Sequence, residues 1–158
     1  MGSQSEPGRK FCGECGTKGS CNGRHLLAGL QAGIVVALEA ASAIGESAKV
    51  EQLLAALVES VLPGTRPPYL DAQATRFRAR SEGDPTRFEA AADQFRRLDL
   101  PFWVAVTQLE HAEWLVAAGR SDDAALVLAE APDTFDELRA TPWLERADRL
   151  RVGAEVAA

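Results

Sequence analysis

Apolar residues recur at three- and four-residue steps along much of the chain, which is the spacing of one face of a helix. Residues 47–61 contain the apolar set Val50, Leu53, Leu54, Leu57, Val58 and Val61. Residues 85–98 contain the set Phe88, Ala91, Ala92, Phe95 and Leu98. The pattern predicts amphipathic helices that each bury one face.

Glycine and proline punctuate these apolar runs in alternation. Gly45, Gly83 and Gly119 each follow an apolar run, as glycine does at a helix C-terminus, and lie 38 and 36 positions apart. The other breaks carry prolines, at positions 63, 67, 68, 101 and 142. Together these signals predict helices over residues 25–44, 47–61, 68–82, 85–98, 102–118, 121–138 and 142–152.

The predicted helices form three hairpins with a period of about 36 residues, followed by a lone helix. This period is typical of helical repeat arrays, in which each pair buries its apolar face against its neighbours. Abundant alanine and sparse aromatic residues, 6% of the chain, also favour helix over sheet. The predicted fold class is therefore all-α, with antiparallel helical hairpins in a stack. The domain begins near Arg24, and residues 1–23 are predicted to form a Cys-rich tail or a small zinc knuckle.

One hairpin, within residues 108–136, has the residue spacing of a known repeat. In this repeat, small residues permit two helices to cross closely, a glycine makes the turn between them, and a larger apolar residue fills the gap. Residues of these kinds stand at the corresponding spacings here: Ala112, Gly119, Ala124, Leu128 and Ala131. This segment resembles a tetratricopeptide repeat (TPR). The motif prefers other residue types at Gln108, His111 and Asp136. The resemblance implies a short TPR-like right-handed array over residues 24–158.

A longer resemblance covers roughly residues 26–150 and is carried by the segments Arg66–Leu70, Pro101–Ala105, Leu109–Leu115 and Pro142–Arg146. They are similar to the C-terminal helical-repeat region of large bacterial signalling proteins that combine a class III nucleotide cyclase domain, a P-loop ATPase domain and such repeats. The chain has no GxxxxGK[ST] phosphate loop, and 158 residues cannot hold all those parts. The resemblance implies a regulatory or scaffolding part without catalysis of its own.

The N-terminal tail contains a possible metal site. Cys12 and Cys15 form a CxxC pair, in which two thiolates from one tight turn approach a single tetrahedral zinc, and Cys21 and His25 could complete a Cys3His site. The segment Lys10–Gly16 also resembles half of the zinc ribbon at the N-terminus of some of the same signalling proteins. The alternative is a degenerate remnant that binds no metal.

Charge and composition restrict the classes of binding partner and the cellular compartment that we expect for this protein. A formal charge of −6 argues against phosphate backbones and anionic membranes as partners. The N-terminus lacks the apolar core of a signal peptide, and the longest apolar stretch, residues 32–41, is far shorter than the ~20 residues that cross a bilayer. Three cysteines confined to a short polar segment suit a reducing cytosol. These features predict a cytoplasmic protein that binds a protein or peptide, or a second copy of itself.

Trp103, Glu110 and Trp114 lie on nearly the same side of one predicted helix, because eleven residues make three helical turns. We predict that they form a partner-binding surface, with packing against a neighbouring helix as the alternative. The nearby His111 is interpreted as a surface or packing residue rather than as a metal ligand with the carboxylates beside it. The arginines of the middle of the chain alternate with acidic residues and are interpreted as solvated surface, at positions 76, 78, 80, 87, 96 and 97.

The function predicted from the sequence is a non-catalytic protein-interaction or scaffolding module. One alternative is a zinc-dependent regulator whose Cys-rich tail contacts nucleic acid or a partner. A second alternative is a small-molecule sensor with a pocket between hairpins.

Overall fold

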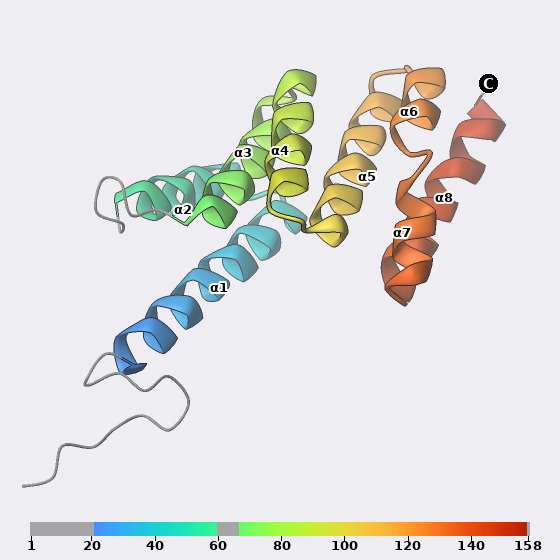
Figure 1. Ribbon diagram of the computed structural model, residues 1–158. Helices are drawn as coiled ribbons and strands as arrows, with labels where there is room; N and C mark the ends of the chain where they lie inside the picture. The colour runs from blue at the N-terminus through green and yellow to red at the C-terminus, as the bar shows by residue number, and fades with distance from the viewer. Residues whose placement is uncertain (1–20, 60–66, 158) are drawn as a thin grey trace, which may run out of the picture.

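The computed structural model describes residues 21–59 and 67–157, and the regular structure in these ranges is entirely helical (Figure 1). The prediction of an all-α fold is confirmed. None of the helices in these ranges combines the length and the hydropathy that a membrane span requires. The helices are α1 (Cys21–Ala43), α2 (Ser47–Glu59), α3 (Pro68–Glu82), α4 (Pro85–Arg97), α5 (Pro101–Ala117), α6 (Ser121–Val127), α7 (Ala131–Glu137) and α8 (Thr141–Ala157).

The ends of α3 and α4 show how local sequence sets the helix boundaries. Proline is the first residue of each, where its fixed φ suits the helix and its missing N–H costs no hydrogen bond. Asp84 caps α4 by accepting a hydrogen bond from the backbone N–H of Thr86 at 2.9 Å. Gly83 ends α3 in the left-handed conformation, with φ of 65°, and its N–H donates to the carbonyl of Ala79.

The prediction of one helix over residues 121–138 is wrong. The structure has two short helices, α6 and α7, separated by a turn at residues 128–130. Pro132 is the second residue of α7. Inside a continuous helix, its ring would clash with the carbonyl of Leu128 and remove one hydrogen bond, so the helix breaks before it. This proline is visible in the sequence and was the signal for the break.

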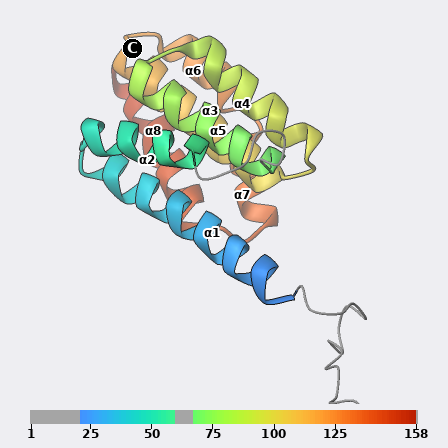
Figure 2. The same cartoon turned by 90° about the vertical axis from the view of Figure 1, so that its left-hand side faces the viewer.

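The helices pack in two layers (Figures 1 and 2). Helix α3 contacts α1 on one side and α5 on the other, and α5 also contacts α8, so α1, α3, α5 and α8 form a first layer. The second layer consists of α2, α4 and the α6–α7 pair, each packed against its neighbours in the first layer. Within the described ranges, helices of the second layer make no lateral contacts of comparable extent with one another.

The core consists of two apolar clusters. One joins α5, α6, α7 and α8 around Leu109 and Phe135, and the other joins α1, α2 and α3 around Leu38 and Phe77. All four of these side chains are fully buried. Burial of each such side chain contributes about 1.5 to 3 kcal/mol to folding. The partly buried Trp103 packs against both clusters and so links the two halves of the molecule.

Candidate functional site in the first layer

The first layer contains a buried arginine in the middle of α3. Arg76 has 0% of its surface exposed. Its Nε donates to Oε2 of Glu110 at 2.7 Å, and its Nη2 donates to Oε1 of Glu110 and to Oε1 of Glu39, both at 2.6 Å. Its Nη1 donates to Oε1 of Gln73 at 2.9 Å. One guanidinium therefore joins α1, α3 and α5.

Electrostatics explain how this arginine can stay charged in the interior. Burial disfavours the charged guanidinium, but Glu110 and Glu39 outweigh that cost and raise the pKa of Arg76. The guanidinium carbon also lies 4.8 Å from the ring centre of Phe77 and 5.1 Å from that of Trp103. Aromatic faces attract cations, so the apolar surroundings of the charge are themselves favourable.

Arg80 lies one helical turn after Arg76 and extends the cluster towards solvent. Its Nη1 contacts Oε2 of Glu39 at 3.2 Å and Oε1 of Glu110 at 3.0 Å. The two carboxylates are therefore shared between two arginines of α3. With 24% of its side chain exposed, Arg80 remains accessible from outside.

A second ion pair of the same kind joins α5 and α8. Nε and Nη2 of Arg146 donate to the two carboxylate oxygens of Glu113, each at 2.6 Å. The guanidinium also lies 5.2 Å from the ring centre of Trp143. Partial burial works against the charge of Arg146, but the hydrogen bonds and the charge of Glu113 raise its pKa. We call the two clusters together the charged network, which consists of Glu39, Arg76, Arg80, Glu110, Glu113 and Arg146.

The charged network follows the repeat of the chain. Glu39 and Arg76 are 37 residues apart, Arg76 and Glu110 are 34 apart, and Glu113 and Arg146 are 33 apart, each close to one hairpin. The sign alternates along the first layer: acidic on α1, basic on α3, acidic on α5 and basic on α8. Each helix therefore meets an oppositely charged neighbour, which favours one register of the stack.

The structure places the residues that the sequence singled out for binding in different surroundings. Glu110 is only 4% exposed and is the main partner of Arg76. Trp103 is half-buried against the ring of Phe95, with their ring centres 6.1 Å apart. Trp114, also half-buried, instead lies against Gly83. Thus Arg76 brings Trp103 and Glu110 together, and Trp114 lies apart from them. A partner-binding role for the three stays a prediction.

The interpretation of the central arginines as solvated surface is wrong for Arg76. A buried arginine is stable when carboxylates pair with it and accept its hydrogen bonds, and here they come from helices more than 30 residues away. Local alternation of charge cannot reveal such pairing. The usable signal was the recurrence of Glu39, Arg76 and Glu110 at about one repeat, each on the first helix of its hairpin.

His111 is a packing residue in this structure. It is 5% exposed, and its ring stacks on Phe88 with the ring centres 5.0 Å apart and an interplanar angle of 7°. Its Nε2 has no hydrogen-bond partner, and burial lowers the pKa of the imidazole. In the part of the chain that the structure describes, no group of three or more His, Cys, Asp or Glu residues could hold a metal ion.

The predicted zinc ligands belong to the N-terminal part of the chain. Cys12 and Cys15 lie outside the described residues. Cys21 and His25 belong to the first turns of α1, but their side chains lie outside the described part. Zinc binding by these four residues stays a prediction.

No protein-family model matches this chain, and no curated protein or solved structure matches it either. The resemblances to TPR repeats and to the helical region of nucleotide-cyclase signalling proteins therefore stay expectations.

Proposed function

We propose that this chain is a non-catalytic interaction module, a TPR-like array of helical hairpins that presents its first layer to a protein or peptide partner. The observation that carries the proposal is the charged network, in which each first-layer helix contributes at least one charged side chain to one of two clusters of ion pairs. A regulatory or scaffolding role in a bacterial signalling system is the corresponding proposal from the sequence resemblance.

The packing of the two layers supports a curved stack. Helices α1, α3, α5 and α8 contact one another in succession, whereas their partners in the second layer do not do so to a comparable extent within the described residues. When neighbouring helices lie closer together in one layer than in the other, the stack curves towards the layer with the closer spacing. Helical repeat arrays use the concave surface formed in this way for binding.

The charges of the first layer favour a partner that carries both signs. Four members of the charged network retain about a quarter to a third of their side-chain surface: Glu39, Arg80, Glu113 and Arg146. A partner that offers a carboxylate to Arg146 or a cation to Glu113 would replace the two 2.6 Å hydrogen bonds of this pair by equivalent ones. The buried pair of Arg76 and Glu110 keeps the helices in register meanwhile.

A peptide selection on the immobilised protein tests this proposal. We expect selected peptides to lose at least about tenfold in affinity, or about 1.4 kcal/mol, in the variants Arg80→Gln and Arg146→Gln. Arg97→Gln is the matched control, because Arg97 is exposed on α4 in the second layer. Thermal melts of all three variants separate loss of binding from loss of folding.

Two outcomes would overturn the proposal. One is a selection that enriches no peptide above background. The other is a set of peptides whose affinity falls with Arg97→Gln and not with either first-layer substitution.

A further inference from the structure

A groove crosses the second layer between α4 and α6, with α5 as its floor. Both helices pack against α5 but, within the described residues, not to a comparable extent against each other. The volume of the groove is about 480 Å³, and ~300 to 1,000 Å³ is usual for small-molecule sites. The argument below concerns two of its walls and its floor, which include Phe88, Ala92, Thr107, His111 and Leu126.

Two buried polar side chains lie one helical turn apart on the floor of this groove. Thr107 is 1% exposed and His111 is 5% exposed. The hydroxyl of Thr107 donates its only proton to the carbonyl of Trp103 at 2.7 Å, so it can only accept a hydrogen bond from a ligand. Nε2 of His111 has no hydrogen-bond partner in the part of the chain that the structure describes. Buried polar atoms of native proteins are nearly always paired, so this nitrogen indicates a group that the chain itself does not supply.

The surroundings of His111 make it an acceptor as well. Burial lowers the pKa of the imidazole below 6.5, so the ring is neutral at pH 7. In the tautomer with the proton on Nδ1, Nε2 carries a lone pair. The charge of Glu89 also acts on the pKa of His111, in the raising direction, which shows that this carboxylate of α4 is near the ring. The floor therefore presents two acceptors to a ligand that carries several N–H donors.

The rim of the groove is acidic. The exposed Glu89 and Glu130 line it and have no ion pair within the described ranges. Asp93 and Arg96 line it too, but they form an ion pair on α4, with Nη1 of Arg96 2.6 Å from Oδ1 of Asp93. The only guanidinium of the lining is thus neutralised by its own helix, and two carboxylates remain without a counter-ion.

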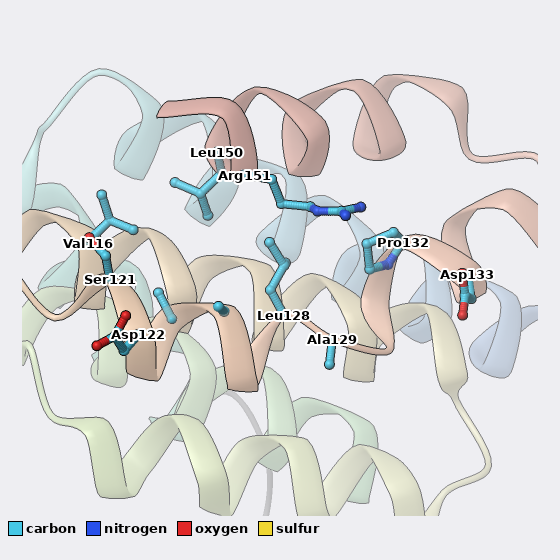
Figure 3. Close-up of a pocket in the computed structure, with 11 residues that line it drawn as sticks. Val116, Ser121, Asp122, Leu128, Ala129, Pro132, Asp133, Leu150 and Arg151 are labelled. Atoms are coloured by element: carbon cyan, nitrogen blue, oxygen red, sulfur yellow. The ribbon is translucent and has the colours of Figure 1, made fainter. Parts of the chain in front are cut away.

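A second pocket, of about 540 Å³, lies on the other side of α6, towards α8 (Figure 3). It exists because α6 packs against α5, whereas α7 packs against both α5 and α8. Leu128 and Leu150 line this pocket, and Arg151 extends across it. Among the described residues, its lining contains no buried polar atom without a partner. The groove over His111 is in this respect different.

We propose that the groove between α4 and α6 binds a guanidinium group on a short alkyl stem. The planar fork of N–H donors suits two acceptors one turn apart, Thr107 and His111, better than a single ammonium does. Glu89 and Glu130 balance the charge at the rim, and the stem lies against the apolar side chain of Leu126. The groove belongs to the second layer, apart from the charged network, so this proposal and the proposed function can each fail without the other.

Three probes with the same stem test the donor chemistry: butylguanidinium, butylammonium and neutral butylurea, each titrated calorimetrically into the full chain. We expect butylguanidinium to bind at least about tenfold more tightly than either of the others. The imidazole nitrogen resonances of His111 should shift when butylguanidinium is added, because Nε2 then accepts a hydrogen bond.

A fourth probe, N-acetylarginine methylamide, distinguishes two sources of the same group. Affinity equal to that of butylguanidinium would assign the groove to an arginine side chain of a peptide. Affinity at least about tenfold weaker would assign it to a free alkylguanidine, because the peptide backbone is then excluded.

Variants assign the binding to this groove. His111→Phe keeps the stack on Phe88 but removes the acceptor, and the double variant Glu89→Gln with Glu130→Gln removes the rim charge at two exposed positions. We expect each to weaken butylguanidinium at least about fivefold. Glu137→Gln is the matched control, since Glu137 is exposed on α7 and does not line the groove. Thermal melts verify that every variant is folded.

Three results would overturn the inference. The first is no binding of butylguanidinium at millimolar concentration, which would mean that water alone satisfies His111. The second is binding of butylammonium or butylurea as tight as that of butylguanidinium, which would remove the requirement for a fork of donors. The third is an affinity that neither His111→Phe nor the double glutamine variant changes, which would place the bound probe elsewhere.

Discussion

Arg76 and Glu110 form a two-point ion pair with N–O distances of 2.7 and 2.6 Å, although 34 residues separate them in the chain. Both side chains are withdrawn from water, with exposures of 0% and 4%. Such a pair depends on its geometry, because the cost of removing two charges from water is recovered only when their hydrogen bonds are well formed. The pair therefore makes the alignment of α3 and α5 a condition for stable folding.

We expect Arg76→Met to destabilise the protein by about 3 to 5 kcal/mol, because it leaves Glu110 buried without its main counter-ion. The double variant Arg76→Met with Glu110→Met should recover part of this loss, since no charge is then orphaned. The free energies of unfolding in urea of the single and the double variant measure the loss and its partial recovery. Arg96→Met is the control: its pair with Asp93 is exposed, and we expect a loss of about 0 to 1 kcal/mol. Equal losses in Arg76→Met and Arg96→Met would contradict the role of the buried pair.

Gly83→Ala should be more harmful than Gly119→Ala. Both glycines have positive φ, 65° and 74°, so alanine strains the backbone at either position by about 1 kcal/mol. A Cβ at Gly83 would also lie 2.9 Å from Nε1 of Trp114, whereas at Gly119 it would meet nothing within 4 Å. Comparison of the two melting temperatures isolates the contact with Trp114. A smaller loss for Gly83→Ala would show that this indole moves freely.

The buried His111 should make stability depend on pH. Burial lowers its pKa below the ordinary 6.5, while the charges of Glu89 and Arg120 act in opposite directions. The unfolded chain therefore takes up the proton first as the pH falls. Stability is complete above the unfolded pKa and decreases as the pH falls through 6.5 towards the folded pKa.

The free energy of unfolding of the parent protein and of His111→Phe, measured between about pH 7.5 and 5, checks this dependence. An ordinary histidine titrates in about this range. Phenylalanine keeps the stack on Phe88 but cannot titrate, so we expect a flatter pH profile than in the parent protein. Arg97→Gln, at an exposed position of α4, is the control that should keep the parent profile. An unchanged slope in His111→Phe would mean that other groups cause the dependence.

Trp103→Ala should cost more stability than Trp114→Ala. Trp103 contacts both apolar clusters and the guanidinium of Arg76, and truncation of a large core aromatic costs about 3 to 5 kcal/mol. Trp114 packs against one cluster only. Thermal melts distinguish packing from binding: an unchanged melting temperature in Trp103→Ala, with weakened binding of selected peptides, would assign this tryptophan to recognition alone.

We expect the chain to bind at most one zinc ion, through Cys12, Cys15, Cys21 and His25. Elemental analysis of the purified protein, and of the variant Cys12→Ser with Cys15→Ser, measures the stoichiometry. Circular dichroism before and after chelation should show the same helix content, because the helical domain has its own core. Loss of helix on chelation would instead make the metal a structural part of the domain.

The sequence by itself determined the helices of this protein and most of their ends. Helix boundaries depend on local signals, such as the proline that begins α3 and the left-handed Gly83 that ends it, and these act within a few residues. The apolar spacing fixed which faces are buried. The helix predicted over residues 121–138 is interrupted before Pro132, and this break too has a local cause.

Only the tertiary structure decided what the charged residues do. Arg76 and Arg97 belong to the same run of alternating charges, yet the first is fully buried and the second is exposed on α4. The difference depends on whether a carboxylate from a helix one repeat away reaches the guanidinium. The pocket beside Leu128 has the same origin, since it exists because α6 and α7 pack against different neighbours. Ion pairs between helices and pockets both depend on distances between helices, which local sequence patterns do not specify.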